Sequence, residues 1–218
     1  NNLGIRHSDL GQPEEAMEAT RRAVGIYERL ARANPAAYEP DLASSLNNLG
    51  AYLSNLGQPE EAMEATRRAV GIYERLARAN PAAYEPYLAM SLNNLGAYLS
   101  DLGQPEAAME ATRRAVEIYE RLARANPAAY EPDLASTLRN LGLDLMEAKL
   151  PDQARDSFKQ AIELLTPYFF KRRQVFAKLM KQLVGNYKLA CREARLTPDA
   201  ALLQPVLDGL AETGEEKD

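Results

Sequence analysis

The chain contains no tryptophan, one cysteine and one histidine among its 218 residues. The single Cys191 cannot form an internal disulfide. Cys191 and His7 together are too few for a conventional zinc site. Neither a glycine-rich phosphate loop nor a nucleophile elbow is present in the sequence. We therefore expect no metal, no cofactor and no enzymatic activity.

Long apolar runs are also missing, since no stretch approaches the roughly 20 residues that a membrane-spanning helix needs. No signal peptide is present, and we expect a cytoplasmic location with no membrane contact. The formal net charge is −5, so the chain as a whole has no general affinity for nucleic acid. Because the sequence starts at Asn1 without a methionine, we expect it to be part of a longer polypeptide.

The dominant feature of the sequence is a repeat of 46 residues. Residues 47–92 return as residues 93–138, with 40 of 46 positions identical. Another copy fills residues 1–46, and a diverged copy opens at Arg139. Repeats of this length, with two helical patterns in each, predict a solenoid in which every helix pair packs on its neighbours.

Each unit is expected to contain two helices joined by a tight turn. In the third unit, leucines at three- and four-residue steps predict a first helix from Pro86 to Leu102. Gly103 ends it, and a second helix is expected from about Pro105 to Ala125. The inward stripe of this second helix should contain Ala108, Thr112, Ala115, Tyr119 and Leu122. The PAAYEP segments, which carry Tyr38, Tyr84 and Tyr130, should connect one unit to the next.

The repeat pattern stops after Pro167. We expect one long helix from about Tyr168 to Arg195. Along one side of it are spaced Val175, Leu179, Leu183, Tyr187 and Ala190. The residues around Asp199 predict the start of a last helix that runs to about Leu210. These two helices are expected to cap the array, with an acidic tail behind them.

These repeats resemble the tetratricopeptide repeat family, in its longer kinesin-light-chain-like form. The resemblance lies in Leu49, Gly50, Gly57, Ala62 and Ala69 and in their equivalents in the third unit. It covers roughly residues 1–167, in units that start near residues 1, 47, 93 and 139, of which the first is truncated. The chain departs from the family at two positions where Thr66 and Thr112 replace an aromatic residue, while Phe158 keeps it. The resemblance implies an all-α, right-handed solenoid of antiparallel helix pairs, with residues 168–218 as C-terminal capping helices and acidic tail.

The first helices of such an array line an inner groove, and asparagines recur there at a fixed position. An asparagine amide is both donor and acceptor, so a row of them can pair with the backbone of an extended peptide of any sequence. The resemblance implies this use for Asn2, Asn48, Asn94 and Asn140. The groove positions around them are Asn47, Asn93, Arg139, Tyr52, Tyr98, Ser54 and Ser100. The alternative is that these asparagines bond to neighbouring helices, or are copied along by recent duplication.

A second candidate site is the basic segment between Tyr168 and Leu196, which contains eight basic residues and one acidic residue. Its candidate polyanion contacts are Lys171, Arg172, Arg173, Lys178 and Lys181. Such a charge excess fits an acidic partner, a nucleic-acid backbone or an anionic lipid surface. The simpler alternative is a solvated helix that balances the acidic array, because aromatic residues do not interleave with the charges.

The sequence as a whole predicts a protein–protein interaction scaffold. We expect it to bind an extended peptide or a partner surface in the groove of the first helices. The family resemblance further suggests a sensor or scaffold arm of a larger protein. Self-assembly through the repeat ends is the alternative from another class, because a truncated first unit would expose core positions such as Leu3.

Overall fold

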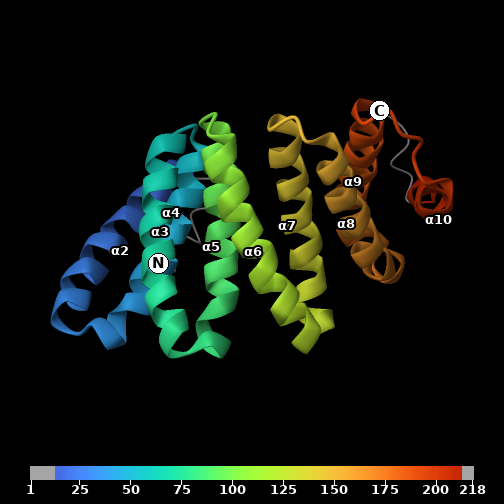
Figure 1. Ribbon diagram of the computed structural model, residues 1–218. Helices are drawn as coiled ribbons and strands as arrows, with labels where there is room; N and C mark the ends of the chain where they lie inside the picture. Colours follow the sequence, from blue (N-terminus) through green and yellow to red (C-terminus); the bar gives the residue numbers. More distant parts are fainter. Residues whose placement is uncertain (1–12, 213–218) are drawn as a thin grey trace. The chain divides into compact units, whose positions relative to one another are not determined.

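The computed structural model describes residues 13–212, and within this range the chain forms helices and no strand (Figure 1). The helices are α2 (Pro13–Ala33), α3 (Pro35–Asn55), α4 (Pro59–Ala79), α5 (Pro81–Asp101), α6 (Pro105–Ala125), α7 (Pro127–Glu147), α8 (Pro151–Lys171), α9 (Arg173–Glu193) and α10 (Ala200–Ala211). Helices α2 to α9 each contain 21 residues. The all-α fold class is confirmed.

Prolines and caps fix where the helices start. Helices α2 to α8 each begin with a proline, whose missing N–H would have no partner in the first turn. Asn34 and Asn80 precede α3 and α5, and each side-chain Oδ1 accepts a hydrogen bond of 3.3 Å from a backbone N–H in the first turn. Gly57 and Gly103 follow the same helices with φ of 72° and 67°, a backbone conformation that glycine adopts readily.

The first helix of each unit starts earlier than the sequence pattern indicated. Helix α5 begins at Pro81, so Pro86 lies inside the helix and the expected start at Pro86 is wrong. The cap at Asn80 and a proline at the first position suffice to start the helix there. The PAAYEP segments are therefore helical, and Tyr38, Tyr84 and Tyr130 lie in helices and not in connections. The second helix is confirmed as α6, with the predicted bounds.

The single long helix expected from Tyr168 to Arg195 is also wrong. Helix α8 continues through Pro167 to Lys171, and α9 starts at Arg173 after a break at Arg172. The backbone of Arg172, with φ −141° and ψ 62°, resembles that of the caps before α3 and α5, so the 46-residue spacing of helix starts continues from α7 to α9. Of the residues expected along one side of that helix, Val175 is 56 % exposed, whereas Leu183, Tyr187 and Ala190 are buried. The division of the chain at residue 167 stays a prediction.

The chain divides into two compact units, Asn1–Ala111 and Thr112–Asp218. In the first unit α2 packs on α3, α3 on α4 and α4 on α5, and α3 also contacts α5. In the second unit α7 packs on α8 and α8 on α9, while α10 contacts α9 and α8. Each unit is thus built from sequence neighbours, as expected of helix-pair repeats.

Close crossings within the pairs depend on glycine. A Cβ on Gly50 of α3 would lie 2.3 Å from Thr66 Oγ1 on α4. A Cβ on Gly142 of α7 would lie 2.4 Å from the Phe158 ring on α8. Both approaches exclude any larger residue without movement of the partner. Gly71, by contrast, has open space around it, which agrees with Glu117 at the same position of the next unit.

Candidate functional site

The recurring asparagines lie on the side of the first helices that is turned away from the buried leucines. Asn48, Asn94 and Asn140 occupy equivalent positions on α3, α5 and α7, and all three are partly exposed. On α3 the residues two before and one after Asn48 are Leu46 and Leu49, both buried. Each helix therefore faces the core with its leucines and carries its asparagine at the surface. Asn2 lies outside the described residues.

The residue before each of these asparagines has a different environment in each helix. Asn47 is 4 % exposed, and its buried Oδ1 has no hydrogen-bond partner. Asn93 is partly exposed. Arg139 is partly exposed, and its Nη1 donates to Oδ1 of Asn140 at 3.1 Å. Burial lowers the pKa of the Arg139 guanidinium, and its buried Nε has no partner.

The tyrosine positions further along these helices are also not equivalent. Tyr52 is partly exposed, whereas Tyr98 is 7 % exposed. Burial, followed by the charge of Asp101, raises the pKa of Tyr98 to about 12. In α7 the same position holds Asp144, which is buried and accepts a hydrogen bond of 2.8 Å from Thr112 Oγ1. Tyr98 therefore belongs to the packing beneath the surface, and Tyr52 is available at the surface.

The remaining groove positions lie at the C-terminal ends of α3 and α5. Ser54 and Ser100 are partly exposed, and the neighbouring Asn55 and Asp101 are exposed. The structure thus places most of the predicted groove residues at or near the surface of the first helices. It places Asn47 and Tyr98 below that surface, where a ligand cannot contact them without rearrangement.

Two further residues of the exposed surface were not predicted as site residues from the sequence. Tyr87 and Met90 of α5 are 50 % and 38 % exposed, respectively. The equivalent residues are Asp133 and Ser136 in α7, so these are two of the few differences between nearly identical units. A difference between copies at an exposed first-helix position was the signal that could have identified them.

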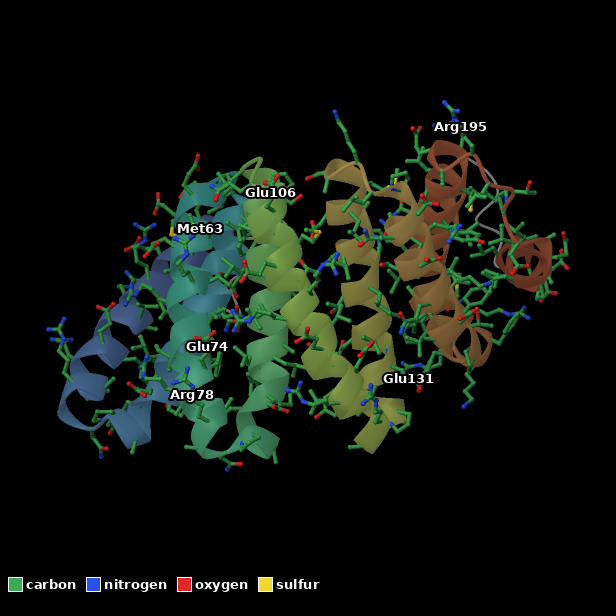
Figure 2. All side chains as sticks on the ribbon, viewed as in Figure 1. Met63, Glu74, Arg78, Glu106, Glu131 and Arg195 are labelled. Carbon is green, nitrogen blue, oxygen red and sulfur yellow. The ribbon has the colours of Figure 1, made fainter. Side chains whose placement is uncertain are left out.

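The basic segment is spread over the end of α8 and over α9. Lys171, Arg172, Lys178 and Lys181 are exposed. Arg173 is partly exposed, forms an ion pair with Glu212 and lies 5.6 Å from the centre of the Phe170 ring. Figure 2 shows Arg195 just beyond the end of α9. The segment is therefore one basic helix end and one basic helix, and Arg173 is already engaged within the protein.

Charged side chains of the second helices pair with one another beside a cavity of about 360 Å³ in the first unit. Arg21 of α2 contacts Glu61 of α4 at 3.0 Å, and Glu28 of α2 pairs with Arg68 of α4. Leu46, Leu49 and Leu53 of α3 line the same cavity. Because these rim charges are paired, the cavity offers no unpaired carboxylate for acid–base chemistry at those positions.

Neither a metal site nor a membrane-spanning helix is found in the described part of the chain. Between residues 13 and 212, no group of three or more His, Cys, Asp and Glu side chains could hold a metal ion. In the same range, no helix combines the length and the apolar character required to cross a membrane.

The chain is built of helix pairs of constant length that recur every 46 residues. Each first helix carries a polar side chain at the same partly exposed position. These features define a helical-repeat protein of the solenoid class. Residues 1–33, 42–79 and 88–125 match the family model of the tetratricopeptide repeat. The chain therefore belongs to the tetratricopeptide repeat family.

Solved structures agree with this assignment at the level of the fold. One is a Podosopora anserina protein described as a kinesin light chain with nearly identical TPR-like repeats. It matches with a TM-score of 0.72 and 21 % identity, over 99 % of this chain and 95 % of that chain. The apo form of RapI matches with a TM-score of 0.67 and 18 % identity, over 97 % of this chain and 67 % of that chain. MamA matches with a TM-score of 0.50 and 19 % identity, over 88 % of this chain and 95 % of that chain. A comparison with curated proteins found no match.

Proposed function

We propose that this protein is an interaction scaffold that binds an extended segment of a partner protein on the exposed stripe of its first helices. In each unit the contact is made by the asparagine amides, Asn48 and Asn94 in the first and Asn140 in the second. The amides pair with the peptide backbone of the partner, so affinity depends on array length more than on the partner's sequence. A cytoplasmic location and a place in a larger protein are part of the same proposal.

The observation that carries this proposal is the recurrence of one partly exposed amide at the same position of α3, α5 and α7. Partial exposure gives a ligand access to the amides of Asn48 and Asn94, which offer both donor and acceptor atoms. Membership of the tetratricopeptide repeat family supports a protein–protein interaction role. The hydrogen bond from Arg139 to Asn140 favours the packing alternative at that position, and a ligand there would have to share or displace it.

The test is a selection of displayed random peptides on the native chain and on the triple variant Asn48→Ala, Asn94→Ala, Asn140→Ala. We expect the native chain to enrich peptides and the triple variant to lose at least most of that enrichment. Alanine is the best helix former, so the helices should persist, which circular dichroism will confirm.

The matched control is the triple variant Glu14→Ala, Glu60→Ala, Glu106→Ala. These glutamates are exposed, recur at one position of the repeat and lie in the first turns of α2, α4 and α6. The control should enrich the same peptides as the native chain. Equal enrichment by the asparagine variant would contradict the proposal and would assign these amides to packing.

Binding of a polyanion by the basic segment is the second candidate. It is favoured by the exposure of Lys171, Arg172, Lys178 and Lys181 over two neighbouring elements. It predicts affinity for single- or double-stranded probes that falls steeply with added salt. No binding at low salt would exclude it. Self-association through the repeat ends predicts instead a mass that rises with protein concentration in light scattering.

A further inference from the structure

An apolar surface occurs on one first helix of the array. Tyr87 and Met90, one turn apart on α5, form the surface that we call the Tyr87–Met90 patch. Helix α3 carries Asp41 and Ser44 at these two positions, and α7 carries Asp133 and Ser136. Because the units are otherwise nearly identical, the patch distinguishes α5 from its two equivalents.

The ring of Tyr87 is held in place from below. It stacks on the ring of Tyr73, with 5.7 Å between ring centres and 16° between ring planes. Tyr73 comes from α4 and is 2 % exposed. One face of the Tyr87 ring therefore lies on a fixed support, while half of the side chain stays open to solvent.

A carboxylate on α3, a helix that contacts α5, acts electrostatically on Tyr73 of this pair. Burial raises the pKa of Tyr73 to about 12, and the neighbouring Tyr87 and the charge of Asp41 contribute to the shift. Asp41 is exposed on α3, one turn before Ser44. Within residues 13–212, Asp41 forms no ion pair. An exposed aromatic face and an unpaired carboxylate thus occur together in the first unit.

We infer that the Tyr87–Met90 patch receives an arginine of the partner segment, together with an apolar side chain next to it in that segment. The guanidinium stacks on Tyr87 on the side of Asp41, and the apolar side chain packs on Met90. This inference rests on the proposed function and names the side chains that the first unit selects.

The chemistry favours arginine over the other candidates. Guanidinium is planar, stacks on aromatic faces and pairs with carboxylates, whereas the lysine ammonium is a point charge without a face to stack. An acidic segment would be repelled by Asp41. The flexible thioether of Met90 adapts to apolar side chains of different shapes. The patch therefore adds a sequence preference to an array whose asparagine amides bind the backbone of the partner segment.

The test uses the same displayed random peptides on the native full chain and on the variant Tyr87→Ala/Met90→Ala. The native chain should enrich peptides in which arginine adjoins an apolar residue. The variant should still enrich peptides, but without that pair, because its asparagines are unchanged. Both substitutions favour helix, and circular dichroism will confirm that the variant is folded.

Affinities of one enriched peptide then measure the arginine contact directly. Replacement of its arginine by citrulline, which keeps the shape and removes the charge, should weaken binding to the native chain about fivefold, since exposed cation–π and ion-pair contacts are modest. The citrulline effect should shrink in Asp41→Asn and disappear in Tyr87→Ala/Met90→Ala. It should persist in Tyr87→Phe, which keeps the ring.

The outcomes separate this inference from the proposed function. Enriched peptides without an arginine preference, or a citrulline effect that is unchanged in Tyr87→Ala/Met90→Ala, would overturn the inference and leave the proposed function intact. Failure of the native chain to enrich any peptide would overturn both.

Discussion

Thr66 in the second repeat and Thr112 in the third stand at the same position of the repeat, but their hydroxyls have different environments. Both are 0 % exposed. Thr66 Oγ1 has no hydrogen-bond partner, whereas Thr112 Oγ1 donates to the buried Asp144 at 2.8 Å. Tyr98 occupies in α5 the position that Asp144 occupies in α7, and places a ring edge near Gly50.

The comparison shows that one buried residue can cost stability in one repeat and contribute to it in another. Whether the threonine hydroxyl has a hydrogen-bond partner depends on the first helix of the following repeat. That helix places Tyr98 near Thr66 and Asp144 near Thr112. In the fourth unit the same position holds Phe158, which packs against Gly142 with no polar group to satisfy. Two repeats of nearly identical sequence can therefore differ in stability.

The largest expected effect is at the aromatic version of this position. Phe158→Ala should lower the free energy of unfolding by about 3 to 5 kcal/mol, because Phe158 is fully buried and its loss leaves a cavity beside Gly142. Urea unfolding followed by circular dichroism measures the change. Val175→Ala, at a residue that is 56 % exposed, serves as the control and should change the free energy by less than about 0.5 kcal/mol. Equal effects of the two substitutions would contradict the assigned core.

Thr112→Val should destabilise the protein by roughly 2 kcal/mol. Valine keeps the shape of threonine but removes the hydrogen bond to the buried Asp144, and loss of a partner by a buried polar group costs about 1 to 3 kcal/mol. The same urea experiment measures this loss. A neutral result would show that Asp144 does not depend on this hydroxyl.

Thr66→Val should act in the opposite direction and stabilise the protein by about 1 kcal/mol. The substitution removes a buried hydroxyl that has no partner, and such groups cost about 1 to 3 kcal/mol to desolvate. Valine and threonine have similar helix propensities, so the backbone term nearly cancels. Unfolding free energies that fall for both Thr66→Val and Thr112→Val would remove the distinction between the two sites.

The smallest effect concerns the turn after α7. Lys149 has φ 59° at the position where Gly57 and Gly103 have φ of 72° and 67°. A left-handed conformation costs a non-glycine residue about 1 to 2 kcal/mol, while glycine adds roughly 0.5 to 1 kcal/mol of chain entropy in the unfolded state. Lys149→Gly should therefore stabilise the protein by about 0.5 kcal/mol, and Gly103→Lys should destabilise it. Thermal unfolding of both variants checks the opposite signs.

The sequence was sufficient to predict the second helices. The bounds of α6 followed from Pro105 at its start and Ala125 before the next break. The starts of the first helices could not be predicted equally well, because two prolines five residues apart, Pro81 and Pro86, both fit a helix start. Only the cap at Asn80 and the packing of the helix decide between them. The break between α8 and α9 at Arg172 could not be predicted, because no proline or glycine occurs there.

The candidate site was predictable in the same limited sense. Helical phase placed Asn48 and Asn94 on the surface stripe, as the structure has them. The burial of Asn47 and Tyr98 was not predictable, because it depends on side chains from neighbouring helices. The stacking of Tyr87 on Tyr73 joins α5 to α4 and is likewise a property of the tertiary structure.

The central claim is that the asparagine amides of the first helices bind a peptide backbone. The most direct measurement is the affinity of two enriched peptides of unrelated sequence for the native chain and for Asn48→Ala, Asn94→Ala and Asn140→Ala separately, by fluorescence anisotropy. Each lost hydrogen bond contributes about 0.5 to 1.5 kcal/mol, so each substitution should weaken binding by roughly 2- to 10-fold, and by the same factor for both peptides. Affinities that remain at the native value in all three variants would contradict the account.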